Sequence, residues 1–491
     1  MEDAYEVVCK WKKNVFDLPK GAPGKSFTQC MIRLNDAFAH ATPLRHIAMK
    51  AKMLMPALLL SKPHQKSKAQ ENKKYLIKRL EYWKEGNINK LLSEGKEIQS
   101  RLESSKSHPS DDGVVAKRFA EMLFNGNGKG AMRLASGQPK GGVLSLDING
   151  MELYENLHPA PKPAHPEAIM SGEKPENVDP VAFSALQGDL IKKCSLRTEG
   201  AAGVSQGEDR LYRKMATCFK DTSTDYCNSL AAIARRYATE LIDPNDLSAL
   251  LANRGIPLDK NPGLRPIGIG EIERRIMGKA IMTIVSKDVQ AAAGSMQLCA
   301  GQSAGVEAAI HAMRQTFEAD ATDGVLLVDA DNAFNRVNRD LALRNIEYVC
   351  PILKFTLTNT YRHPSRIFVL GGHEIASQEG TTQGCPFAMA MYALTISPMI
   401  VRLQGKCTQA WFADDGTGAG KLVQIRAWWD ELVKIGPQYG YFPKAEKSWL
   451  IVKEGQFEEA KKIFKGTKVQ ITKEGKRHLG AAIGSEKFKK E

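Results

Sequence analysis

A chain of 491 residues with 43% hydrophobic residues is too apolar for wholesale disorder and long enough for two to four folded domains. Its net charge of +14 favours a polyanionic partner, most commonly nucleic acid, although basic residues can also serve solubility alone. The nine cysteines form no Cys-x-x-Cys pair and do not support a zinc ribbon. Scattered thiols without a signal-peptide pattern indicate an intracellular protein, nuclear or cytoplasmic and not secreted.

Residues 1–150 are predicted to form a basic, mostly helical N-terminal region. Residues 1–100 contain 19 Lys and Arg against 10 Asp and Glu, which supplies +9 of the net charge. Residues 64–108 combine alternating charge with apolar residues at helical spacing, which predicts one or two amphipathic helices. Their basic face is either a solvated surface or a nucleic-acid contact, and the two interpretations are equally supported.

A proline-rich segment at residues 151–180 is predicted to be a linker. Residues 181–320 then follow a mostly helical pattern, interrupted at 256–268 by three prolines. These prolines exclude a helix and predict an antiparallel hairpin or extended ribbon. Lys260 and Arg265 flank its turn and suit a triphosphate, although an ordinary basic turn is the simpler interpretation of this stretch alone.

From residue 321 onward, strand-like and helical runs alternate. The pattern predicts strands at 325–329, 366–370, 409–413 and 449–452, and helices at 338–349, 388–401 and 422–435. Interleaved strands and helices indicate an α+β sheet covered on one face by helices. The uncharged run 380–401 contains polar residues and prolines, so it predicts a buried helix and no membrane contact.

Three aspartates follow predicted strands. Asp414 and Asp415 come at a tight hairpin turn, and Asp329 ends the apolar run 325–329. Buried like charges repel and are costly unless a cation neutralises them or their pKa rises. Three carboxylates on neighbouring strands can hold two divalent ions ~3.5–4 Å apart, an arrangement that activates a 3′-hydroxyl and stabilises a leaving pyrophosphate.

Three motifs in chain order resemble the palm motifs of reverse transcriptases, especially those of non-LTR retroelements. The motifs are Val328–Val337 with its Ala-Phe pair, Glu379–Pro386 with its Gln-Gly loop, and the Phe-Ala-Asp-Asp box Phe412–Asp415. Each motif alone is weak, but Asp329 and Asp414 lie 85 positions apart with the Gln-Gly loop between them. The resemblance covers roughly residues 256–484, with weaker similarity back to about 195.

The resemblance implies a role for each matched residue. Asp329, Asp414 and Asp415 would bind two Mg²⁺ ions, with Mn²⁺ as a possible substitute. Phe334 would pack under the sugar and exclude a 2′-hydroxyl, and Gln383 and Gly384 would lie beside the nascent base pair. The residues implied to contact the triphosphate or its leaving group are Lys260, Arg265 and Lys447.

The resemblance also implies a right-hand polymerase fold behind the helical N-terminal region, with an antiparallel palm sheet backed by helices. Fingers would occupy 181–320 and the palm 321–491, with part of 340–380 assignable to the fingers. The palm would end near a primer grip formed by His478, Leu479 and Gly480. A thumb is expected to be missing, because the chain ends at Glu491.

The activity implied is RNA-directed DNA synthesis as part of a retrotransposon. Its partners would be an RNA template, a DNA or RNA primer and dNTPs. One alternative is a decayed or domesticated non-catalytic protein whose basic N-terminal region binds RNA or DNA. A second alternative is an RNA-dependent RNA polymerase, against which Phe334 and Ala413 speak.

Overall fold

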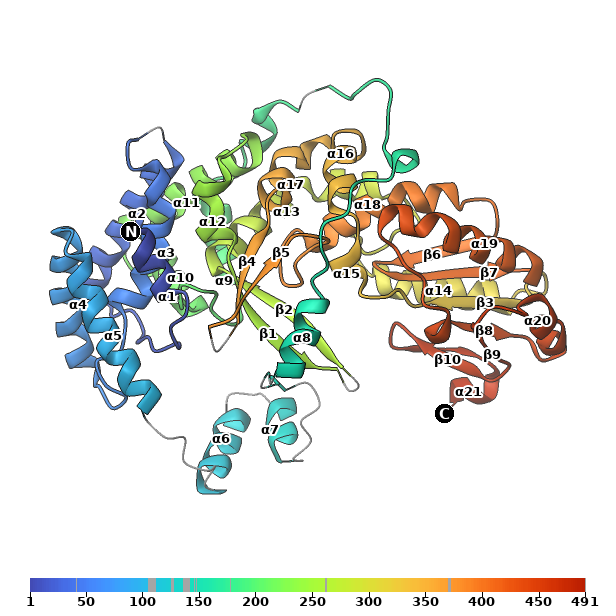
Figure 1. The fold of residues 1–491 in the computed structure, drawn as a ribbon, viewed down its shortest axis with the longest axis horizontal. Coiled ribbons are helices and arrows are strands. Elements are labelled where there is room, and N and C mark those ends of the chain that lie inside the picture. The colour runs from blue at the N-terminus through green and yellow to red at the C-terminus, as the bar shows by residue number, and fades with distance from the viewer. Residues whose placement is uncertain are drawn as a thin grey trace.

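A computed structural model of the protein describes residues 1–40, 42–104, 112–124, 128–135, 142–144, 146, 148–176, 178–260, 263–369 and 372–490. The fold is α+β, as predicted, with helices outnumbering strands among the described residues. Figure 1 shows an elongated molecule with the N-terminal helices at one end, a four-stranded sheet in the middle and a five-stranded sheet at the other end.

The N-terminal helices pack directly on a later group of helices. The first group is α1 (Glu2–Val8), α2 (Ala22–Ala39), α3 (Arg45–Leu59), α4 (Ala69–Lys84) and α5 (Ile88–Ser104). The later group is α9 (Gly188–Leu196), α10 (Asp209–Thr217), α11 (Asp221–Thr239), α12 (Pro244–Leu251) and α13 (Ile272–Ala293). Helix α2 packs on α11 and α3 on α12, and the two groups share one hydrophobic core. The predicted amphipathic helices at 64–108 are α4 and α5.

A buried ion pair crosses this shared core. Lys52 on α3 lies 2.6 Å from Glu273 on α13, and both side chains are almost fully buried. The second carboxylate oxygen of Glu273 accepts a hydrogen bond of 2.5 Å from the Tyr226 hydroxyl on α11. Three helices distant in sequence therefore meet at one charged site inside the apolar core.

The four-stranded sheet contains the predicted ribbon. Its strands are β1 (Asn253–Asp259), β2 (Leu264–Gly270), β4 (Ser365–Val369) and β5 (Glu374–Ser377), in the order β2-β1-β4-β5. Strands β1 and β2 form an antiparallel hairpin in which Asp259 pairs with Leu264. This confirms the prediction for 256–268; Asn261 and Pro262 of its turn lie outside the described residues.

The five-stranded sheet has β3 at its centre. Its strands are β3 (Gly324–Val328), β6 (Thr408–Phe412), β7 (Asp415–Gly420), β8 (Trp449–Val452) and β9 (Gln470–Thr472), in the order β6-β7-β3-β8-β9. Strand β3 is antiparallel to both β7 and β8, so Asp329, just after its end, comes beside the β6–β7 turn. Strand β9 is parallel to β8, which corrects the expectation of an antiparallel sheet at this edge.

Both faces of this sheet are covered, which corrects the prediction of one covered face. Helices α18 (Ala388–Arg402), α19 (Leu422–Ile435) and α20 (Phe457–Ile463) pack on the face that carries Leu326 and Val328. Helix α14 (Gly305–Glu318) and strand β11 (Ala481–Gly484) cover the opposite face, which carries Val325 and Leu327. Every residue of β3 is buried, as expected of a strand enclosed on both sides.

The other described helices are α6 (Asp112–Phe124), α7 (Gly128–Ala135), α8 (Ile148–Asn156), α15 (Ala333–Arg336), α16 (Arg339–Val349), α17 (Lys354–Tyr361) and α21 (Glu486–Lys490). Helix α18 is largely buried, as predicted for the uncharged run. Among the described residues, no helix combines the length and apolarity needed to span a bilayer.

Residues 157–176, within the segment predicted to be a linker, form an extended strap (Figure 1). The strap runs from α8 past α15 and along α16, and its backbone groups bond to side chains there. These bonds join Leu157 to Asn335 (2.7 Å), Lys162 to Glu379 (2.5 Å), Ala164 to Asp340 (3.0 Å) and Ala168 and Met170 to Asn345 (both 2.9 Å). An extended segment makes few hydrogen bonds within itself, so these side chains provide hydrogen-bond partners for its backbone N–H and C=O groups.

Candidate active site

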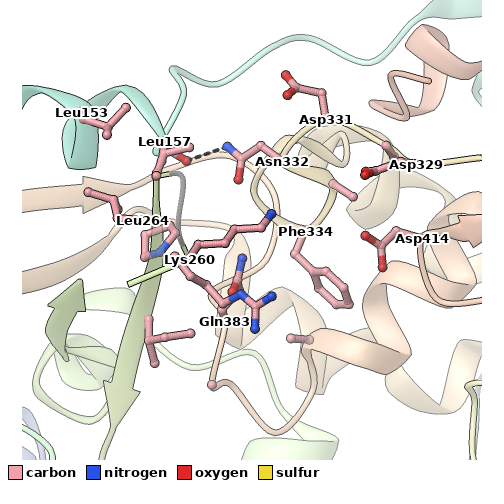
Figure 2. A pocket seen from close by; sticks show the side chains of 18 of the residues that line it. Leu153, Leu157, Lys260, Leu264, Asp329, Asp331, Asn332, Phe334, Gln383 and Asp414 are labelled. Carbon is pink, nitrogen blue, oxygen red and sulfur yellow. Dashed lines mark hydrogen bonds between the residues drawn. The ribbon is translucent and has the colours of Figure 1, made fainter. Parts of the chain in front are cut away.

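A cavity of 690 Å³ lies between the β1–β2 hairpin and the end of β3 (Figure 2). Eight of the predicted site residues line it: Lys260, Arg265, Asp329, Phe334, Gln383, Gly384, Asp414 and Lys447. They come from the ends and turns of strands in both sheets, from helix α15, from the loop before α18 and from the segment before β8. Four predicted residues do not line it: Asp415, His478, Leu479 and Gly480.

Asp329 is placed by the end of β3. Its backbone carbonyl accepts a 2.8 Å hydrogen bond from the backbone N–H of Lys444, and its own N–H donates to the Ser448 hydroxyl at 3.3 Å. The segment before β8 thus fixes the backbone that carries the carboxylate. In Figure 2 the Asp329 and Asp414 side chains extend toward each other across one side of the cavity.

Asp414 occupies a two-residue turn between β6 and β7, in which Phe412 pairs with Asp415. The turn requires Ala413 to adopt φ +55°, a left-handed conformation that is unfavourable for a residue with a Cβ. Buried Gln297 holds Ala413 there: its side chain accepts from the Ala413 N–H at 2.9 Å and donates to the Ala413 carbonyl at 3.1 Å. The Tyr441 hydroxyl donates to the Asp414 carbonyl at 2.9 Å.

The carboxylates of this turn are electrostatically unfavourable as anions. Burial raises the pKa of Asp415 to about 7, and the neighbouring Asp414 and Asp329 add to the rise. Burial and Asp329 also raise the pKa of Asp414, while Lys260 and Arg265 partly oppose that rise. In the described part of the chain, no three His, Cys, Asp or Glu side chains are grouped closely enough to hold an ion as they stand. Carboxylates without a neutralising cation repel one another.

Asp415 makes stability depend on pH. An ordinary aspartate titrates near 3.8, whereas folded Asp415 keeps its proton to about pH 7, so unfolding between these values releases a proton. The contribution of Asp415 to stability therefore falls as pH rises through this window. We expect Asp415→Asn, in EDTA, to raise the melting temperature by on the order of 2 °C at pH 8 but not at pH 4. Scanning fluorimetry measures this, and an equal gain at both pH values would contradict it.

The Gln-Gly loop is held by strand β2 and by Arg339 of α16. The N–H of Gly268 on β2 donates to the Gln383 carbonyl at 2.9 Å. Gly384 has φ +107°, and a Cβ there would come within 2.4 Å of the Gly268 carbonyl oxygen, so this close approach requires glycine. Buried Arg339 donates to the carbonyls of Glu379 (3.0 Å) and Gly380 (2.9 Å) and fixes the start of the loop.

Phe334 forms part of the cavity floor. It lies on the short helix α15, and its ring stacks on buried Tyr392 of α18 with centroids 4.6 Å apart. Lys260 and Arg265 lie at the hairpin end, both exposed, and Lys447 is exposed on the opposite side. The cavity therefore places exposed cations around a half-buried aromatic ring and an acidic edge.

The predicted primer grip is a tight hairpin outside the cavity lining. Strand β10 (Gly475–His478) pairs with β11, and His478 pairs with Ala481. Leu479 and Gly480 both have positive φ, +50° and +88°, as a two-residue hairpin turn with right-handed strand twist requires. Burial lowers the pKa of His478 to about 4, so its imidazole is neutral at pH 7.

Some residues that build this site were not predicted. Leu153 on α8 and Leu157 on the strap line the cavity, although 151–180 was predicted to be a linker. Gln297 is a single glutamine in a loop, and no sequence pattern distinguishes it. No protein-family model matches the chain, and no curated protein sequence is detectably similar to it.

Proposed function

We propose that the protein is an RNA-directed DNA polymerase of a retroelement, with the five-stranded sheet as the palm and the β1–β2 hairpin as part of the fingers. The observation that carries the proposal is the cavity itself. Residues separated by up to 187 positions, each predicted for one reaction, line the same 690 Å³ space. Asp329 and Asp414 occupy one side and Lys260 and Arg265 the other, an arrangement suited to nucleotidyl transfer.

Asp329, Asp414 and Asp415 would hold the metal. They fit a divalent cation because burial, with the neighbouring carboxylates, raises the pKa of both Asp414 and Asp415, and no ion pair joins the three to Lys or Arg among the described residues. When bound, two Mg²⁺ ions, or Mn²⁺, supply a lowered pKa at the primer 3′-hydroxyl and positive charge at the leaving group. Gln297 and Tyr441 fix the turn, so the carboxylates are positioned before substrate arrives.

The remaining cavity residues would bind and orient the nucleotide. Lys260 and Arg265 would neutralise phosphate charge, and Lys447 would contact the triphosphate or protonate the leaving group. Gln383, held by β2, would contact the nascent base pair.

Primer extension on poly(rA)/oligo(dT) with Mg²⁺ or Mn²⁺ tests the proposal directly. Soluble folded protein is expected to incorporate dTTP in proportion to enzyme concentration. Absence of incorporation with either metal would refute the proposed activity. Salt-dependent RNA binding without incorporation would instead support a non-catalytic nucleic-acid-binding protein.

Phe334→Ala is expected to relax sugar selectivity. The Phe334 ring, held by Tyr392, would clash with a 2′-hydroxyl, and its removal opens that space. The ratio of rNTP to dNTP incorporation efficiency should rise by about 10–100-fold, measured as kcat/KM with single nucleotides. Phe334→Tyr, which keeps the bulk, should retain the wild-type preference. A wild type that prefers rNTPs would point to an RNA polymerase.

A further inference from the structure

A second cavity, of 270 Å³, lies on the strap side of the first. The two cavities share Leu157, Asp331 and Asn332 as lining residues, so they are adjacent. Across this shared wall the Asn332 side chain donates a 2.9 Å hydrogen bond to the Leu157 carbonyl, drawn as the dashed line in Figure 2. The same view shows the Asp331 carboxylate pointing away from Asp414.

The charged side chains that line the second cavity are Lys162, Arg336, Asp331 and Glu379, and Lys444 pairs with Asp331 from outside the lining, so three cations face two carboxylates. Arg336 and Lys162 lie over the Phe442 ring, 3.9 Å and 5.3 Å from its centroid, which directs their long side chains into this region. Arg336 and Lys444 both pair with Asp331, at 2.5 Å and 3.0 Å. These hydrogen bonds outweigh the effect of burial and lower the pKa of Asp331.

Positive charge remains after these pairings. Asp331 is shared by two cations, and Glu379 accepts hydrogen bonds from the backbone N–H groups of Lys162 and Arg339. The Lys162 ammonium has no carboxylate partner among the described residues. Because cations already lie over the Phe442 ring, that ring is a poor platform for a nucleobase. The site therefore favours a compact anion over a stacked single strand.

We propose that this second cavity binds pyrophosphate as it leaves the active site, with Lys162 and Arg336 as its cationic ligands. The inference rests on the proposed polymerase function. In that reaction the primer 3′-oxygen bonds to the α-phosphorus and the α–β phosphoanhydride bond breaks, so a multiply charged anion is released beside Asp331 and Asn332. The Lys162 ammonium lines the second cavity, on the other side of the wall that Leu157, Asp331 and Asn332 form. It can therefore bind the anion outside the nucleotide cavity.

Lys162→Glu is the informative variant because the strap is held through the Lys162 backbone, which the substitution keeps. Lys193→Glu, at an exposed lysine on α9 that lines neither cavity, is the charge-matched control. Two assays on the full chain compare them with wild type. Calorimetry measures binding of inorganic pyrophosphate to the free protein, and primer assays compare pyrophosphorolysis with first-turnover dNTP incorporation.

Lys162→Glu is expected to weaken pyrophosphate binding and to slow pyrophosphorolysis at low pyrophosphate, each by about fivefold or more. First-turnover incorporation should stay within about twofold, and Lys193→Glu should match wild type. Unchanged pyrophosphate binding in Lys162→Glu would overturn the inference, as would an effect confined to primer–template affinity. If Lys162→Glu weakens pyrophosphate binding but the wild type has no polymerase activity, the anion site is supported and the polymerase function is refuted.

Discussion

Replacing Asp414 with asparagine is expected to lower the primer-extension rate about 10³-fold or more while leaving the protein at least as stable as wild type. The carboxylate lies beside that of Asp329 on one side of the cavity, and the neutral amide would be a poor ligand for Mg²⁺ (Figure 2). Such a rate loss corresponds to about 4 kcal/mol of transition-state stabilisation. Stability should be maintained because the substitution removes a buried negative charge that is repelled by Asp329.

Activity and folding must be measured on the same preparations of this variant. Single-turnover dTTP incorporation gives the rate, and thermal unfolding in EDTA gives the stability. Asp430→Asn is the control, because Asp430 is an exposed aspartate paired with Arg426 on α19. Incorporation at the wild-type rate by Asp414→Asn would contradict the proposed metal site. A loss of rate together with a lowered melting temperature would point to a structural defect.

Replacing Lys52 with alanine is expected to destabilise the helical part of the molecule by about 3–5 kcal/mol. Lys52 is the cationic partner of Glu273 in the shared core, and both side chains are within 1% of complete burial. Truncation leaves the Glu273 carboxylate buried without its ion pair and creates a cavity between α3 and α13. Urea unfolding followed by helical circular dichroism measures the effect as a lowered midpoint.

Two further variants distinguish loss of the buried Lys52–Glu273 ion pair from a general destabilisation of helix α3. Lys50 lies on the same helix but pairs with the exposed Glu2, so Lys50→Ala should change stability by less than about 1 kcal/mol. The double variant Lys52→Met/Glu273→Gln removes both charges and should recover much of the loss. An equal destabilisation by Lys50→Ala and Lys52→Ala would contradict a special role for the buried pair.

Local pattern predicted the elements of the five-stranded sheet closely. Helix 422–435 and strand 449–452 have the predicted bounds, and strand 325–329 ends one residue early, because their apolar periodicity directly reflects burial. Eight of the twelve site residues implied by the resemblance to reverse transcriptases line one cavity, whereas Asp415, His478, Leu479 and Gly480 do not.

Packing between elements distant in the chain could not be predicted from the sequence. An amphipathic pattern shows that α2 and α3 have an apolar face but not that α11 and α12 cover it. The strap has the composition of a flexible linker, and the residues that hold it, such as Asn345, look like the solvated face of α16. Gln297 acts only through its pairing with the β6–β7 turn, which no nearby residue signals.

The common core of the first and later helices determines how far this chain can be shortened from its N-terminus. A chain beginning at residue 181 would leave the apolar sides of α11 and α12 in water, where exposed hydrophobic surface promotes aggregation. Helices α1–α5 therefore cannot be replaced by an unrelated domain without exposing this core. Substitutions in α1–α5 at the interface would require compensating substitutions in the core around Glu273.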